Sequence, residues 1–213
     1  MTGLTTTTCH WIVDARSPIP YTQTRSGEAQ QHKQLSRFAG PDELDGQTVY
    51  REYNASGTQR LLQRRSAGIF EVGYARPANA VLHDEPVLLL PQPLTTDSQW
   101  QAPVTTNLLE WRKHSLENND RRFRKELGAT FRCTSLTERV RTPAGTFTDV
   151  ARIEASGHKT INYGSLQEQS VIHVELRRWY APGVGLIKSE RREYAESREL
   201  NPGEATRILE RID

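Results

Sequence analysis

Apolar and polar residues alternate along most of the chain beyond residue 46. In residues 69–75, Phe70, Val72 and Tyr74 fall on one side of an extended chain, and the residues between them fall on the other. A period of two predicts a half-buried β-strand. By the same criterion we expect strands over residues 48–53, 59–65, 69–75, 130–140, 147–155, 171–180 and 186–194. Strands that follow one another at this spacing, with turn residues between them, predict antiparallel hairpins.

Residues 171–180 show the alternation most clearly. Ile172, Val174 and Leu176 share one face of the expected strand, and the other face is polar. That polar face carries His173, Glu175 and Arg177. The pattern predicts a strand with one face on the core and the other face in water.

Proline and glycine mark two tight turns in the second half of the chain. Pro143 and Gly145 lie between two expected strands, and Pro182, Gly183 and Gly185 lie in the next hairpin. Proline fixes φ, and glycine adopts positive φ without strain, so both suit a chain reversal. We therefore interpret these residues as structural. A phosphate-binding loop would need a helix after it, and a strand is expected there.

Three other segments give less regular patterns. Residues 1–45 contain proline breaks and a polar stretch, and we expect them to form an extended N-terminal arm before a single antiparallel β domain over residues 46–213. The prolines in residues 85–94 exclude a central strand and predict an extended connector. Residues 104–127 fit a short helix or strands, and strand, loop, strand is favoured. A further turn is expected at residues 156–158.

Composition narrows the class of protein. The 213 residues are 35% apolar and 25% charged, which is typical of one globular domain with a polar surface. Net charge is +2, and the paired arginines are scattered among acidic residues. This argues against a nucleic-acid partner, and we expect solvated strand faces at these pairs. No apolar run is long enough for a transmembrane helix. The first residues also lack the apolar core of a signal peptide, which indicates a cytoplasmic protein or a leader removed before residue 1.

No pattern typical of catalysis or metal binding is present. The six histidines are isolated, and we expect neither an enzyme, nor a metal, nor a cofactor. The aromatic residues Trp100, Trp111, Trp179 and Tyr180 are the candidate ligand-binding residues, because a curved sheet can enclose an apolar cavity. The alternative is that they form an ordinary core.

The chain has two cysteines, Cys9 and Cys133. A disulfide between them would close a long loop and, in the chain-entropy model, stabilise the fold by about 4–5 kcal/mol. Two free thiols, or a lipid on Cys9, are the alternatives.

Three segments resemble a poorly characterised family of bacterial envelope lipoproteins. Residues 179–190 are similar to its W-Y-A-P-G-V-G-L-V-K hairpin, and residues 141–147 are similar to its hairpin ending in T-P-A-G-T-F. Residues 91–94, followed by Trp100, resemble its L-P-x-P-L…W connector. The resemblance covers roughly residues 46–195, and the last hairpin is its most specific part.

The resemblance implies a fold, a compartment and a role. The expected fold is mainly β, a curved sheet or half-barrel of hairpins like that of the lipoprotein carriers LolA and LolB. The expected location is the periplasm or the outer membrane. The role that we expect is a non-catalytic component of a larger envelope assembly, with other envelope proteins as partners. The alternative role is to carry lipid or another apolar ligand on the concave face of the sheet.

Overall fold

The structure is a computed structural model that describes residues 18–25, 32–53, 58–76, 79–112, 122–163 and 168–209. Within these residues every regular element is a β-strand. The strands are β1 (Pro18–Arg25), β2 (His32–Leu44), β3 (Gln47–Tyr53), β4 (Gln59–Arg65), β5 (Gly68–Arg76), β6 (Asn79–Pro91), β7 (Gln99–Thr105), β8 (Glu110–Trp111), β9 (Glu126–Thr142), β10 (Gly145–Tyr163), β11 (Glu168–Ala181), β12 (Gly185–Ala195), β13 (Leu200–Asn201) and β14 (Gly203–Leu209). The expected mainly β, antiparallel fold is confirmed.

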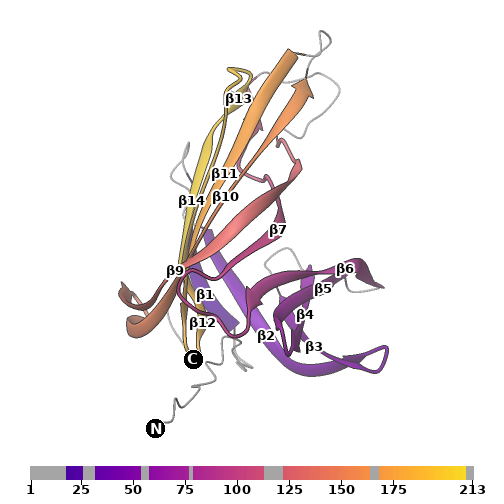
Figure 1. The fold of residues 1–213 in the computed structure, drawn as a ribbon, viewed down its shortest axis with the longest axis vertical. Helices are drawn as coiled ribbons and strands as arrows, with labels where there is room; N and C mark the ends of the chain where they lie inside the picture. Colours follow the sequence, from indigo (N-terminus) through magenta and orange to yellow (C-terminus); the bar gives the residue numbers. More distant parts are fainter. Residues whose placement is uncertain are drawn as a thin grey trace.

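Twelve of these strands form one antiparallel sheet, in the order β6-β5-β4-β3-β2-β1-β14-β12-β11-β10-β9-β7. Strands β10, β11 and β14 run along the long axis of the molecule, and β3 to β6 lie to one side of its lower half (Figure 1). The strands at the two ends of the sheet, β6 and β7, are consecutive in the chain. The sheet is therefore curved, so that its two ends approach each other without pairing among the described residues.

The main core lies on the inner face of this curved sheet. Ile69 and Leu90 from β5 and β6 belong to the same buried cluster as Phe131, Ile153 and residues of β11. Alternation puts one face of each long strand into this cluster and leaves the other face in water, as the burial along β11 shows. The predicted division of β11 into an apolar and a polar face is confirmed. A smaller cluster lies within β3, β4 and β5, and another lies near the β9–β10 turn.

The two predicted tight turns are present. Gly145 has φ of 140°, Gly183 has φ of 72° and Gly185 has φ of 87°. Pro143 precedes the first of these glycines, and Pro182 precedes the second. These values lie in the region that L-residues with side chains rarely adopt, so the hairpins need glycine at these positions.

The prediction of an extended arm over residues 1–45 is wrong where the structure describes it. Strand β1 pairs with β14 as well as with β2, and β2 pairs with β3. Among the described residues, Pro18 and Pro20 pair with β2 alone, because the described pairing with β14 begins at Tyr21. Pro41 lies at an irregularity between β2 and β3. Edges and bulges are where a sheet tolerates proline, so these residues do not break the strands. Residues 1–17 lie outside the described part.

The turn predicted at residues 156–158 is also wrong. Strand β10 continues to Tyr163, and Gly157 lies opposite Val174 in the middle of a regular ladder. A Cβ on Gly157 would come within 2.5 Å of the Gly128 carbonyl oxygen. Glycine is needed here because another backbone approaches closely, not because the chain turns.

The remaining predicted segments agree with the structure. Residues 85–91 of the predicted proline-rich connector are the last part of β6, which is an end strand and not a central one, and residues 92–94 follow the strand without regular structure. Residues 104–112 and 122–127 contain only strand ends, short bridges and loop. No helix in the described residues could span a membrane.

Candidate functional site

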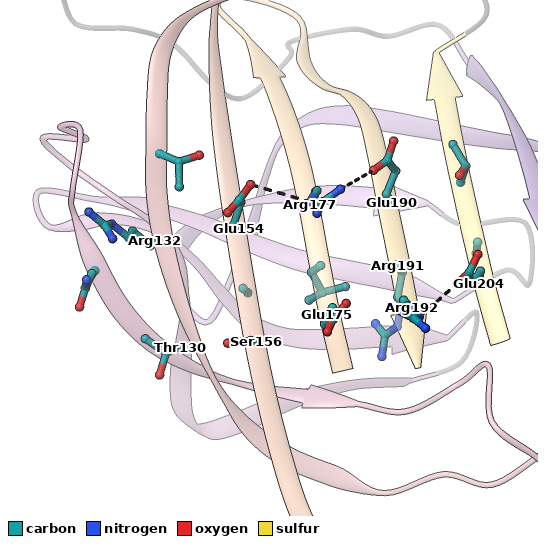
Figure 2. A pocket seen from close by; sticks show the side chains of 16 residues that line it. Thr130, Arg132, Glu154, Ser156, Glu175, Arg177, Glu190, Arg191, Arg192 and Glu204 are labelled. Carbon is teal, nitrogen blue, oxygen red and sulfur yellow. Dashed lines mark ion pairs between the residues drawn. The ribbon is translucent and has the colours of Figure 1, made fainter. Parts of the chain in front are cut away.

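The outer face of β9, β10, β11 and β12 carries a ladder of charged side chains. Arg132 on β9 lies opposite Glu154 on β10, which lies opposite Arg177 on β11, which lies opposite Glu190 on β12. These four residues alternate in sign across four neighbouring strands (Figure 2). They share one face because side chains directly opposite each other in a ladder point the same way.

The pairs along this ladder are loose and exposed. Arg177 lies 3.9 Å from Glu154 and 3.7 Å from Glu190, and its side chain is 62% exposed. Arg132 pairs instead with Asp97, which precedes β7. Exposed ion pairs of this kind contribute about 0–1 kcal/mol each to stability, so stability alone does not explain the ladder.

A second row runs beside the first. Glu175 on β11 lies opposite Arg192 on β12, and Arg192 forms an ion pair with Glu204 on β14 at 3.2 Å. Arg192 also lies 5.0 Å from the centre of the Tyr194 ring. The Tyr194 hydroxyl is 3.2 Å from a Glu175 oxygen. Desolvation first, and then the negative charge of Glu175, raise the pKa of Tyr194 above its ordinary value.

Two histidines extend this polar face beyond the second row. The His173 ring stacks on the Tyr194 ring, with centroids 4.6 Å apart, and the His158 ring lies 6.1 Å from His173 on the neighbouring strand. His173 Nε2 is 3.9 Å from Glu196. The face therefore offers charges of both signs together with half-buried aromatic rings.

The charged face is hollowed. A depression of about 650 Å³ opens over it. We call this depression the charged hollow; its lining residues that point outward are polar, and they are Gln99, Thr130, Arg132, Thr134, Glu154, Ser156, Glu175, Arg177, Glu190, Arg192, Glu204 and Thr206. In Figure 2 the ladder from Glu154 to Glu190 crosses the floor of the hollow, and the Arg192–Glu204 pair lies below it. These outward side chains present charged and hydrogen-bonding groups, which suit a polar partner.

Strand β12 supplies part of the hollow with its outer face, and a buried carboxylate on its inner face holds the loop that follows β7. Glu193 is fully buried, and its carboxylate accepts backbone hydrogen bonds from Asn107, Leu108 and Leu109 at 2.8–3.1 Å. Arg191 donates to the same carboxylate at 2.5 Å. The loop after β7 is thus fixed to β12. Burial and the nearby Arg178 lower the pKa of Arg191, against the opposing effect of Glu193.

A second charged cluster lies on β3 to β6. Arg60 on β4 binds Glu71 on β5 through two nitrogens at 2.6 and 2.8 Å, and it binds Glu52 at 2.9 Å. His83 Nε2 lies 3.3 Å from the other Glu71 oxygen. Burial opposes the charge of Arg60, but its two carboxylates outweigh burial and raise its pKa above the ordinary value. Among the described residues, no group of three or more side chains is suited to hold a metal ion.

The four aromatic residues predicted to bind a ligand lie in the core or against it. Trp100 is 8% exposed and stacks on Phe131 with centroids 5.4 Å apart. Trp111 and Tyr180 are half-buried against the same main core. Trp179 belongs to the smaller cluster, where its Nε1 donates to Glu138 at 2.9 Å. The structure therefore does not bring these four side chains to one cavity, and ligand binding by them stays a prediction.

The predicted disulfide also stays a prediction. Cys133 is fully buried on β9, and its Sγ lies 3.4 Å from the Ser135 carbonyl oxygen. Burial raises the pKa of this thiol. Cys9 lies outside the described residues.

The sequence alone does not reveal the charged hollow, because the residues of the hollow come from six strands. The alternation of β11 does place Glu175 and Arg177 on the outer face, so these two residues of the hollow can be predicted from the sequence as surface residues. The opposite residues on β9, β10, β12 and β14 could be identified only from the order and register of the sheet.

Comparisons with known proteins give little further information. No protein family and no curated protein matches the chain. A solved structure from Bacteroides fragilis, named as an exported protein with a YmcC-like fold, is 14% identical, and the match covers 96% of this chain and 99% of that chain with a TM-score of 0.47. Another from Parabacteroides distasonis, named as a lipoprotein, is 15% identical, with the same coverage and a TM-score of 0.46. Similarities at this level assign neither a family nor a function.

Proposed function

We propose that this chain is a non-catalytic binding protein of the bacterial cell envelope, and that it receives another protein on the charged hollow. The observation that carries the proposal is the alternation of Arg132, Glu154, Arg177 and Glu190 across one hollowed sheet face. The location in the envelope rests on the resemblance of the last hairpin to an envelope lipoprotein family.

The form of the ladder supports a protein as the partner. Charges of both signs at regular spacing are complementary to a surface that also carries both signs, and such patterning gives specificity more than raw affinity. The loose pairs around Arg177 can be exchanged for pairs with a partner at small cost, because exposed ion pairs are weak.

The arrangement does not favour a carrier of lipid. Most lining residues of the hollow are polar or charged, with Ala155, Leu176 and Ala205 as the apolar ones, whereas Trp100 and Trp179 are 8% exposed. Binding of an apolar ligand would require exposed aromatic surface, and these two tryptophan side chains are packed against other residues of the protein instead. Native mass spectrometry of the purified protein gives a direct check, and we expect no bound lipid.

Photo-crosslinking tests the proposed site. A benzophenone amino acid would replace Ser156, an exposed residue of the hollow, and separately Thr146, an exposed residue of the β9–β10 hairpin. We expect one discrete protein adduct in envelope extracts from position 156 and none from position 146. When Arg177→Glu is combined with the benzophenone residue at position 156, the adduct should be lost. The substitution places a third acidic side chain between Glu154 and Glu190 and so removes the alternation of charge.

The test requires that the Arg177→Glu protein keeps its fold. Because the Arg177 side chain is exposed, we expect the substitution to change the free energy of unfolding by no more than about 1 kcal/mol. An adduct that forms equally at both positions, or that survives Arg177→Glu, would show that the hollow is not the binding surface.

A further inference from the structure

The exposed large apolar residues of the described chain gather at one hairpin. Tyr74 is 36% exposed, Val81 is 39% exposed and Leu82 is 46% exposed. All three lie where β5 and β6 meet: Tyr74 pairs with Val81, and the neighbouring Gly73 pairs with Leu82. This hairpin projects sideways from the rest of the sheet (Figure 1). Tyr74 and Val81 lie on one face of the hairpin and Leu82 lies on the other, so exposed apolar side chains flank its free edge on both faces.

Charged residues without a partner in the described part of the chain lie on the same hairpin. Arg76 is exposed at the end of β5, and Asp84 and Glu85 are exposed further along β6. None of the three forms an ion pair or a side-chain hydrogen bond with a residue that the structure describes, whereas the neighbouring Glu71 is held by Arg60 and His83. The hairpin thus carries an exposed cation at one end and two exposed carboxylates towards its base.

The hairpin also carries an open strand edge. Among the described strands β6 pairs with β5 alone, and its segment Asn79–Leu82 is in regular register. At the other end of the sheet, β7 is also paired on one side only by the strands that the structure describes, but it contains Pro103, which lacks a backbone donor. Proline is a common device that protects an edge strand from pairing, and the segment Asn79–Leu82 has no such protection.

We propose that a second copy of this chain docks on the hairpin edge, with Asn79–Leu82 of the two copies paired antiparallel about a two-fold axis. Antiparallel pairing places the base of one hairpin beside the end of the other. It therefore brings Asp84 and Glu85 of each copy towards Arg76 of the second copy. It also brings the Val81 side chains of the two copies near each other on one face of the joined sheet and the Leu82 side chains on the other face, which removes exposed apolar surface from water.

Charge complementarity is what selects a second copy as the occupant. The exposed charges occur in opposite signs at opposite ends of one short edge, and a two-fold axis exchanges those ends. The paired segment is short, because the register of β5 and β6 shifts beyond Leu82. We expect a weak dimer, since the contact is smaller than that of stable complexes. This surface is separate from the charged hollow, so the dimer can be absent while the proposed function holds.

Sedimentation velocity on the full chain tests the proposal over a series up to about 1 mM, because the oligomeric state follows protomer concentration. We expect a reversible monomer–dimer equilibrium. Val81→Lys should weaken it by about tenfold or more, because it buries an unpaired charge at the contact. Arg76→Glu alone, and Asp84→Lys with Glu85→Lys, should each weaken it as well.

Mixing the two charge variants is the decisive measurement. At one end of a mixed dimer, the glutamate introduced at position 76 of one variant meets the two lysines introduced in the other. At the opposite end the unchanged Arg76 meets the unchanged Asp84 and Glu85, so both ends are complementary and association should return. Circular dichroism of each variant checks that the sheet is intact.

Two results would overturn the proposal directly. One is a wild-type chain that stays monomeric over the concentration series, and the other is a mixture of the two charge variants that fails to associate. Monomeric protein that binds phosphatidylcholine vesicles through Val81 would overturn it in favour of a lipid surface.

Discussion

The carboxylate of Glu193 accepts the backbone N–H of Leu108 at 2.8 Å, although 85 positions separate the two residues in the chain. Glu193 is fully buried, and it receives two further backbone donors and the Arg191 guanidinium. A buried carboxylate is stable only when its charge is paired and its oxygens are hydrogen-bonded, and both conditions are met here. This contact fixes the loop after β7 to β12.

We expect Glu193→Ala to lower the free energy of unfolding by about 3 kcal/mol. The variant leaves three backbone donors without an acceptor and Arg191 without its carboxylate. Urea denaturation at pH 7 measures the change. Glu204→Gln is the control, because its 62% exposed carboxylate on β14 contributes less than about 1 kcal/mol. Equal effects of the two variants would contradict the structural role of Glu193.

The same strand shows what the sequence could predict. Alternation predicts β12 as a strand, and the sequence pattern predicts that its arginine pair lies on a solvated face. In the structure Arg192 is exposed, whereas Arg191 points inward to Glu193. Consecutive residues of a regular strand point to opposite faces, so at this place in β12 one arginine of the pair lies on the inner side. The interpretation as a solvated face was therefore wrong for one residue of the pair.

The sheet order could not be predicted from local pattern. Pairing of β1 with β14 joins residues such as Thr24 and Thr206, which no periodicity connects. The charged ladder depends on the same long-range order, because Arg132 and Glu190 lie three strands apart. Turn residues such as Gly183 were predicted correctly because their conformation depends on their own chemistry.

Glu71 gives a prediction about pH. Burial tends to raise the pKa of Glu71, but Arg60 and His83 outweigh burial, and the pKa lies below its ordinary value of 4.5. The unfolded chain therefore binds a proton at this site more readily than the folded chain. The contribution to stability is present above pH 4.5 and is lost as the pH falls through the pKa of the folded state.

We expect the wild-type protein to lose stability below pH 4.5 faster than Glu71→Gln, which cannot titrate at this position. Urea denaturation at pH 7, 4.5 and 3 measures the difference between the two proteins. The difference should be largest at pH 7 and should shrink at acid pH. A difference that stays constant over this range would show that Glu71 is not held by Arg60 in the folded protein.

Cys133 is expected to react slowly in the native protein. Its side chain is fully buried, and burial raises the pKa of the thiol, which lowers the fraction of reactive thiolate. In a Cys9→Ser variant, in which Cys133 is the remaining cysteine, alkylation by iodoacetamide at pH 8 should be about 100-fold slower than in urea, because reaction requires opening of the core. Mass spectrometry over time gives both rates. Equal rates would mean that Cys133 is accessible in the folded chain.

Gly157 and Gly128 form a matched pair for the close approach of β9 and β10. A Cβ at Gly157 would lie 2.5 Å from the Gly128 oxygen and 2.8 Å from a Leu127 methyl carbon, whereas a Cβ at Gly128 would meet no atom within 4 Å. We expect Gly157→Ala to lower the free energy of unfolding by about 1–3 kcal/mol through overpacking. Gly128→Ala should leave stability unchanged or raise it by about 0.4–1 kcal/mol, because alanine restricts the unfolded chain. Thermal and urea denaturation of both variants distinguish the two positions. If residues 156–158 formed the turn expected from the sequence, Gly157→Ala would be as harmless as Gly128→Ala, and the continuous ladder of β10 would be excluded.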